Sequence, residues 1–274
     1  MSTPPPLMRV PTLAWRGGAQ AEASRALPEE VAVALTYERA TFAVMMASPT
    51  DLEDFAIGFS LAEGIIARPE EITDFKIIQA EAGVECRMSL VPQRRTALEA
   101  RRRHITGPVG CGLCGLDSLQ EAARPSPVVY SALRITAEAI ADAAARMQQM
   151  QHLNRETRGV HAAAFFNPSR PDILLREDIG RHNALDKIAG AVARRGDAPA
   201  NGVVFVTSRV SLDLIQKTAS LGVPVLVAIS VPTARAVREA QAAGITLIAI
   251  ARDDGFEIFT HPQRIIFGVK SDVA

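Results

Sequence analysis

The chain has 274 residues, of which 48% are apolar and 22% charged, and its 30 basic and 30 acidic residues leave no net charge. This composition fits a globular protein of one or two domains with a sizeable core, and it argues against a general nucleic-acid binder. The first residues lack the pattern of a signal peptide, and no apolar run is long enough for a membrane span. Its 3 cysteines do not indicate a disulfide framework, so we expect a cytoplasmic protein with reduced thiols.

The N-terminal half predicts a flexible lead-in followed by a small α+β domain. Residues 1–25 are rich in proline, alanine and glycine, which is typical of a loose segment. Arg94 to Arg103 carries five arginines opposed only by Glu99, and the alternative to a functional role for them is a solvated charge run. We assign residues 26–127 to the α+β domain, with strands over 31–37, 42–47, 75–79 and 84–90 and a helix beginning near 48–54.

The C-terminal half, residues 128–274, predicts an α/β domain. An alanine-rich helix over 136–151 comes first. After it, short apolar runs alternate with helical segments, and this alternation predicts a largely parallel sheet with helices packed on it. The expected strands are 160–166, 173–175, 203–206, 225–229 and 246–250, and the expected helices are 184–194, 211–220 and 234–243.

Polar side chains follow three of these strands, where ligands bind in such sheets. Free N–H groups at the helix N-termini favour phosphate, Arg209 could hold a phosphate with both guanidinium arms, and Asp253 could accept hydrogen bonds from a base edge. Alternatively, the hydroxyls only cap helices and Arg209 forms a surface ion pair. Neither a P-loop nor a Gly-x-Gly-x-x-Gly motif is present, which disfavours an ordinary ATPase or dehydrogenase. The candidate residues are Thr207, Ser208, Arg209, Ser230, Arg252 and Asp253.

The segment Glu177–Lys187 is densely polar and lies between an expected strand and an expected helix. Arg181 and His182 fall near the positive end of that helix, where further positive charge is unfavourable unless an anion binds. The alternative is an Asp178–Arg181 ion pair beside a surface histidine. The sequence leaves both interpretations open.

Cys111 and Cys114 lie in the run Gly-Cys-Gly-Leu-Cys-Gly, which suits a redox pair, a metal site or a sulfur relay. Structural zinc needs four ligands, and only Cys86, His104 and His161 are obvious additions. A deaminase zinc site lacks its glutamate here, and the glycine-framed loop is a poor match to a thioredoxin motif. The remaining option is a relay in which a thiolate, favoured by nearby arginines, carries a persulfide sulfur.

Taken together, several motifs resemble the FdhD family of formate dehydrogenase accessory sulfurtransferases. The resemblance runs from about Val31 to the C-terminus. Its most specific parts are the Cys loop and the eleven residues of Glu177–Lys187. The other matching segments are Arg101–Arg103, Gly159–Ala163, Ser208–Ser211 and Thr260–Pro262.

This resemblance implies a sulfur carrier that takes persulfide sulfur from a cysteine desulfurase and passes it to the molybdenum or tungsten bis-guanine-dinucleotide cofactor before formate dehydrogenase receives it. By position, Cys111 matches the persulfide carrier and Cys114 its partner. The family also implies a homodimer, GDP as a cofactor analogue, and a three-layer C-terminal domain similar to cytidine deaminases without their zinc. A cofactor-holding chaperone and a zinc-binding interaction module are the alternatives. The stretch that matches the family's cofactor-binding segment is Phe256, Glu257, Ile258, Phe259, Thr260 and His261.

Overall fold

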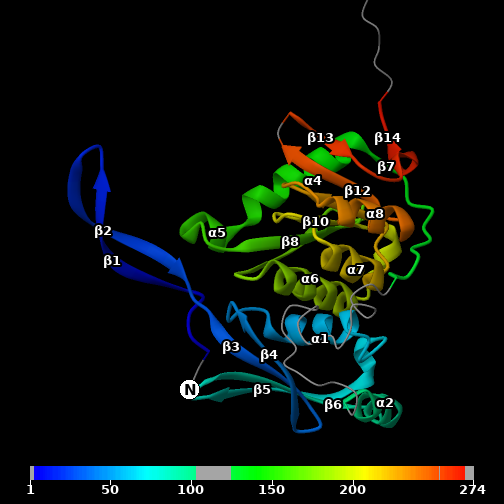
Figure 1. Ribbon diagram of the computed structural model, residues 1–274, viewed down its shortest axis with the longest axis horizontal. Coiled ribbons are helices and arrows are strands. Elements are labelled where there is room, and N and C mark those ends of the chain that lie inside the picture. The colour runs from blue at the N-terminus through cyan, green and yellow to red at the C-terminus, as the bar shows by residue number, and fades with distance from the viewer. Residues whose placement is uncertain (1–2, 103–124, 253, 269–274) are drawn as a thin grey trace, which may run out of the picture.

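The computed structural model describes residues 3–102, 125–252 and 254–268. Figure 1 shows a smaller four-stranded sheet with helix α1 on it, a larger six-stranded sheet above, and a two-stranded hairpin that projects to one side. The mixed α/β fold predicted from the sequence is therefore confirmed. No helix in the described ranges is long and apolar enough to cross a membrane.

The N-terminal segment forms a β-hairpin, which corrects the expectation of a flexible lead-in over residues 1–25. Strands β1 (Leu7–Arg16) and β2 (Ala19–Pro28) pair antiparallel along their whole length. Gly17 and Gly18 connect them with positive φ angles of 58° and 84°, as a tight hairpin turn requires. Backbone hydrogen bonds stabilise an antiparallel pair of strands whatever side chains it carries. The proline, alanine and glycine content of this segment therefore did not reveal the hairpin.

The smaller sheet has the strand order β4-β3-β6-β5, and its buried face packs against α1 (Leu52–Ala62). Leu35, Phe55 and Met88 are fully buried between sheet and helix. The four strands agree with the sequence expectation, with slightly wider bounds for three of them. They are β3 (Val31–Tyr37), β4 (Ala40–Ala47), β5 (Ile72–Ala80) and β6 (Gly83–Leu90), and α2 (Pro92–Arg102) follows.

The larger sheet has the strand order β13-β12-β11-β10-β8-β9. Only β10, β11 and β12 are mutually parallel neighbours; β8 runs antiparallel to β10, β9 to β8, and β13 to β12. The expected largely parallel sheet is thus wrong for its outer strands, which are joined by short turns rather than crossover helices. The strands are β8 (His161–Phe166), β9 (Ile173–Asp178), β10 (Val203–Val206), β11 (Val225–Ala228), β12 (Thr246–Arg252) and β13 (Gly255–Ile258).

Helices cover both faces of this sheet and make three layers (Figure 1). Alternation along β10 assigns its side chains to two cores: Val204 and Val206 pack with α6, α7 and α8, while Val203 and Phe205 pack with α4. A short parallel pair of strands lies beside the larger sheet and consists of β7 (Ile135–Thr136) and β14 (Ile265–Ile266). The helices are α4 (Ala137–Met150), α5 (His152–Thr157), α6 (Arg181–Arg195), α7 (Leu212–Leu221) and α8 (Ala234–Ala242).

Two glycines let α1 and α6 touch along their backbones. A Cβ added at Gly58 would lie 1.7 Å from the carbonyl oxygen of Asp186, and one at Gly190 would lie 2.0 Å from that of Asp54. No other residue type fits these positions without moving a helix. This contact joins the smaller sheet and its helix to the larger sheet.

Candidate functional site

Cys111, Cys114, Arg103 and Asp253 lie outside the described residues. Cys86 is described, and its thiol is completely buried next to the carbonyl oxygen of Leu52. Burial raises the pKa of Cys86 to about 12, which keeps it a neutral thiol. Cys86 is therefore a poor metal ligand and a poor nucleophile, and it adds nothing to the zinc interpretation of the other two cysteines.

The carboxyl ends of β10 and β11 open into a cavity of about 360 Å³. Thr207, Ser208 and Arg209 line it from the loop after β10, and Ser230 lines it from the loop after β11. These four were grouped from the sequence, and the fold brings them together. The other lining residues are His161, Arg181, Ser211 and Thr233.

Three helices begin at this cavity. Arg181 is the first residue of α6, and Ser211 and Thr233 are the N-cap residues of α7 and α8. Their free N–H groups and aligned dipoles create positive potential at one point, as a phosphate site requires. Helix capping explains only Thr233, whose side chain accepts a hydrogen bond from the N–H of Ala236 at 3.1 Å.

Two arginines add charge to the cavity. Arg209 is exposed and forms no ion pair with another residue that the structure describes. Arg181 lines the same cavity rather than pairing with Asp178. The Ser211 hydroxyl is buried, and no described atom hydrogen-bonds to it. An oxyanion would match this combination of cations and free donors.

Two histidines near the cavity are uncharged at neutral pH. Burial lowers the pKa of His161, and Arg181 lowers it further. Burial also lowers the pKa of His182 to about 4, although the contact with Asp213 on α7 acts in the opposite direction. Sequence reasoning missed Asp213, because its partner lies on another helix and only the fold brings them together.

The predicted residues of the C-terminal stretch divide between the two edges of the sheet. Arg252 ends β12 at the carboxyl edge but lines no described cavity. Phe256, Glu257 and Ile258 lie on β13, which carries the chain back toward the amino edge, where Phe259 hydrogen-bonds to Leu247.

At that amino edge the remaining two predicted residues stabilise the start of β12. The Thr260 hydroxyl accepts a hydrogen bond from the N–H of Leu247 at 2.9 Å and donates to the carbonyl of Ile245 at 2.7 Å. A ring nitrogen of His261 lies 2.9 Å from the carbonyl oxygen of Gln241. Neither residue reaches the cavity described above.

The segment Glu177–Lys187 joins the two sheets. Lys187 and Asp178 are fully buried and form an ion pair at 2.7 Å. Both also bind the backbone of Ser48: its N–H donates to Asp178 at 3.0 Å, and its carbonyl accepts from Lys187 at 3.1 Å. Asn183 adds a bond to the carbonyl of Met46 at 2.8 Å. Asp178, Asn183 and Lys187 therefore hold the two parts of the molecule together, whereas Arg181 faces the cavity.

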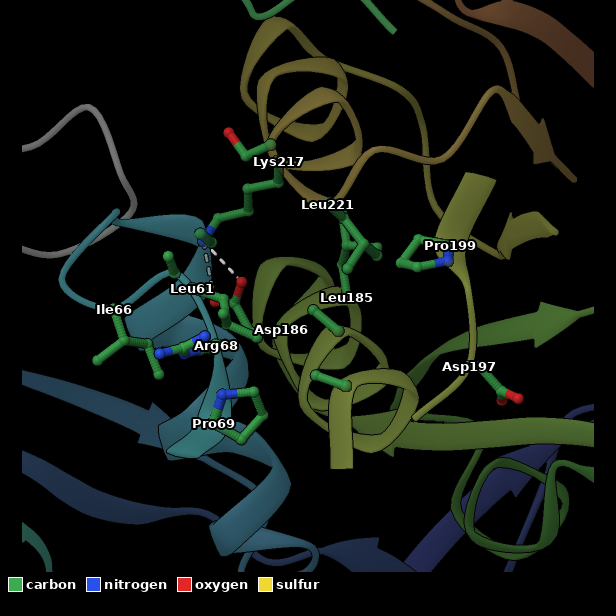
Figure 2. A pocket seen from close by; sticks show the side chains of 15 residues that line it. Leu61, Ile66, Arg68, Pro69, Leu185, Asp186, Asp197, Pro199, Lys217 and Leu221 are labelled. Carbon is green, nitrogen blue, oxygen red and sulfur yellow. Dashed lines mark hydrogen bonds and ion pairs between the residues drawn. The ribbon is translucent and has the colours of Figure 1, made fainter. Parts of the chain in front are cut away.

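A second cavity, of about 390 Å³, lies where α1, α6 and α7 meet. Its walls are mostly apolar, with Leu61 and Ile66 on one side and Leu185 and Leu221 on the other (Figure 2). Lys217 reaches across to Asp186 and binds both carboxylate oxygens, at 2.7 and 2.9 Å. No group of three or more His, Cys, Asp and Glu side chains suited to a metal ion occurs among the residues that the structure describes.

The FdhD/NarQ family model matches residues 28–266. The chain is 51% identical over 259 residues to the sulfur carrier protein FdhD of Agrobacterium fabrum, which covers 94% of this chain and 96% of that one. It is 43% identical over 254 residues to the same-named protein of Xanthomonas campestris pv. campestris, which covers 93% and 90%.

A solved structure shares the fold. It is the crystal structure of a protein from Desulfotalea psychrophila described as a formate dehydrogenase accessory protein, with a TM-score of 0.74 and 23% sequence identity over 96% of this chain and 100% of that one. The likeness to cytidine deaminases stays a prediction. The extent of the family match and the identity to its curated members are decisive: this chain belongs to the FdhD/NarQ family.

Proposed function

We propose that this protein is a sulfurtransferase that carries persulfide sulfur on Cys111. It receives the sulfur from a cysteine desulfurase and delivers it to the molybdenum or tungsten bis-guanine-dinucleotide cofactor, its substrate, before formate dehydrogenase receives that cofactor. The relatives named sulfur carrier protein support the first part. The observation that supports the second is the cavity of Arg181 and Arg209 at three helix N-termini, which suits the phosphates of a dinucleotide.

The chemistry needs two thiols. The Cys111 thiolate attacks the outer sulfur of the desulfurase persulfide, the donor S–S bond breaks, and the donor cysteine leaves as a thiolate. Cys114 then attacks the inner sulfur of the Cys111 persulfide, which releases hydrosulfide and leaves a disulfide between the two cysteines. A cellular thiol must reduce that disulfide before the next cycle.

Intact mass spectrometry tests the carrier role. After incubation with a desulfurase and cysteine, the wild-type protein should gain one sulfur atom, and Cys111→Ala should gain none. Cys114→Ala should accept sulfur but release it slowly. If Cys111→Ala supports formate dehydrogenase maturation as well as wild type does, the cofactor-holding chaperone is the better interpretation. One zinc ion per chain in the wild-type protein, absent from both cysteine variants, would favour the zinc-binding interaction module.

Calorimetry with GDP tests the phosphate site. Arg181→Gln and Arg209→Gln should each weaken GDP binding, and raising the salt concentration should weaken binding to wild type more than to either variant. Arg134→Gln is the matched control, because Arg134 is an exposed arginine that precedes β7 and lies away from the cavity. Unchanged affinity in both cavity variants would contradict the assignment. We also propose that the protein is a homodimer, which sedimentation in an analytical ultracentrifuge would detect.

A further inference from the structure

The N-terminal hairpin of β1 and β2, called the arm from here on, stands outside the rest of the molecule. Figure 1 shows it projecting away from both sheets, with only its base beside α5. There Arg9 pairs with Glu156 at 3.4 Å, and Arg25 donates to the carbonyl of Thr157 at 3.5 Å. None of the three apolar cores of the described residues includes a residue of the arm. The chain therefore fixes the base of the arm and leaves most of its length uncovered.

One face of the arm carries large apolar side chains toward its tip. Side chains alternate between the two faces of a strand, so Pro11, Leu13 and Trp15 share one face with Ala26 of β2, which pairs with Arg9. At the base Ala26 is only 5% exposed, whereas Leu13 is 67% and Trp15 74% exposed. Neighbouring apolar side chains that remain this exposed mark a surface for another macromolecule.

The arm also needs another layer for its own stability. A two-stranded ribbon is at best marginally stable in water, and it becomes stable when a further strand or a packed face covers it. Here the strands pair from Leu7 and Pro28 at the base to Arg16 and Ala19 at the tip. The contacts with α5 reach only the base, so a second molecule must cover the outer part.

The size of the arm indicates that this molecule is a second copy of the same chain. Each strand has 10 residues, which gives a face of about 33 Å by 10 Å. One arm lying on an unrelated protein would remove only about 660 Å² from solvent, less than the roughly 1,000 Å² of a specific interface. Two copies that exchange arms remove about 1,300 Å², which is the size of a standard interface. Reciprocal exchange also closes the assembly under two-fold symmetry.

We propose that the arm packs on a second copy of this chain, with Leu13 and Trp15 as the side chains that anchor it. Tryptophan is enriched among the few residues that dominate the binding energy of interfaces. The chain has no net charge, so two copies do not repel each other. The inference rests on the homodimer proposed above and adds to it the surface that forms the dimer.

Trp15 is the single tryptophan of the chain, so its fluorescence reports on the arm without a label. Sedimentation and quenching by acrylamide, a neutral molecule, are measured on the full chain over one series of protein concentrations. In the dimer Trp15 should emit at shorter wavelength and resist quenching. Dilution should shift the emission to longer wavelength and increase quenching over the same range in which sedimentation changes from dimer to monomer.

Two variants separate the arm from other exposed apolar surface. Leu13→Ser keeps Trp15 as the probe and should raise the dissociation constant of the dimer by at least about 30-fold, because each dimer loses the anchoring side chain twice. Tyr130→Ser is the matched control, since Tyr130 is 85% exposed in the segment before β7, and it should change neither measurement. Circular dichroism should show that both variants fold, because both side chains are exposed.

The outcomes separate this inference from the proposed function. A dimer in which acrylamide quenches Trp15 as strongly as in the monomer overturns the arm assignment and leaves the homodimer standing. A dimer that Tyr130→Ser disrupts and Leu13→Ser does not also overturns it. A chain that is monomeric at every concentration overturns both the arm assignment and the homodimer, and an arm still exposed there belongs to a different macromolecule. Sulfur transfer to Cys111 is measured by mass spectrometry and does not depend on these results.

Discussion

Lys187 of α6 lies 2.7 Å from Asp178 at the end of β9, and neither side chain has any solvent exposure. The two charges also hold the backbone of Ser48, which belongs to the segment after β4. A buried ion pair needs further hydrogen bonds to offset its loss of hydration. Here Ser48, in the segment after β4 of the smaller sheet, supplies two of them. The pair is thus complete only when the two parts of the molecule are assembled.

Lys187→Met should therefore destabilise the protein by about 3–5 kcal/mol, because it leaves Asp178 buried without a countercharge. Urea unfolding measures the loss. Lys76→Met is the control: Lys76 pairs with Asp74 at 3.0 Å, but both side chains are more than half exposed, so it should stay within about 1 kcal/mol of wild type. Similar losses in the two variants would show that the buried pair has no special role.

Gly58→Ala and Gly190→Ala should each destabilise the protein by at least about 2 kcal/mol, because their methyl groups would collide with backbone atoms of the facing helix. A loss of stability would be informative, because alanine in place of glycine normally stabilises a helix. Gly196→Ala is the control: it has a positive φ of 69° but open space around it, and it should lose only about 1 kcal/mol. Thermal unfolding that moves upward in the first two variants would contradict the close helix contact.

Lys217→Met should lose more stability at pH 7.5 than at pH 5. Burial raises the pKa of Asp186 to about 6 even with Lys217 beside it, and removing that cation raises the pKa further. A carboxyl with a raised pKa in the folded state stabilises that state at low pH and ceases to do so as the pH rises through that value. The protonated Asp186 needs no partner, whereas the ionised one does. Urea unfolding at the two pH values should show the difference, and Asp186→Asn combined with Lys217→Met should remove it.

His182 should have the opposite pH dependence. Its pKa is lowered to about 4 by burial, so between about pH 4 and 6.5 the unfolded chain binds a proton that the folded protein does not. Acidification through this range destabilises wild type but not His182→Gln. The stability difference between the two proteins should therefore be about 2 kcal/mol smaller at pH 5 than at pH 7. An equal difference at both pH values would show that His182 is protonated in the folded state.

The sequence alone determined most secondary structure and the grouping of one site. Short, mostly apolar runs located β3, β10 and β11, because buried strands need such patterns. Thr207, Arg209 and Ser230 were grouped correctly, since the carboxyl ends of neighbouring parallel strands meet at one edge. The motifs also indicated the family, and the comparisons confirmed it.

Tertiary structure decided what local patterns could not encode. Strand direction at the sheet margins depends on pairing between distant segments, and it carried Thr260 and His261 to the edge opposite the cavity. The partner of Lys187 likewise depends on how the two sheets dock, because a charge becomes buried only when another part of the chain covers it. Residue types and periods are local properties of the chain, whereas burial, strand order and charge pairing arise from contacts between residues far apart in sequence.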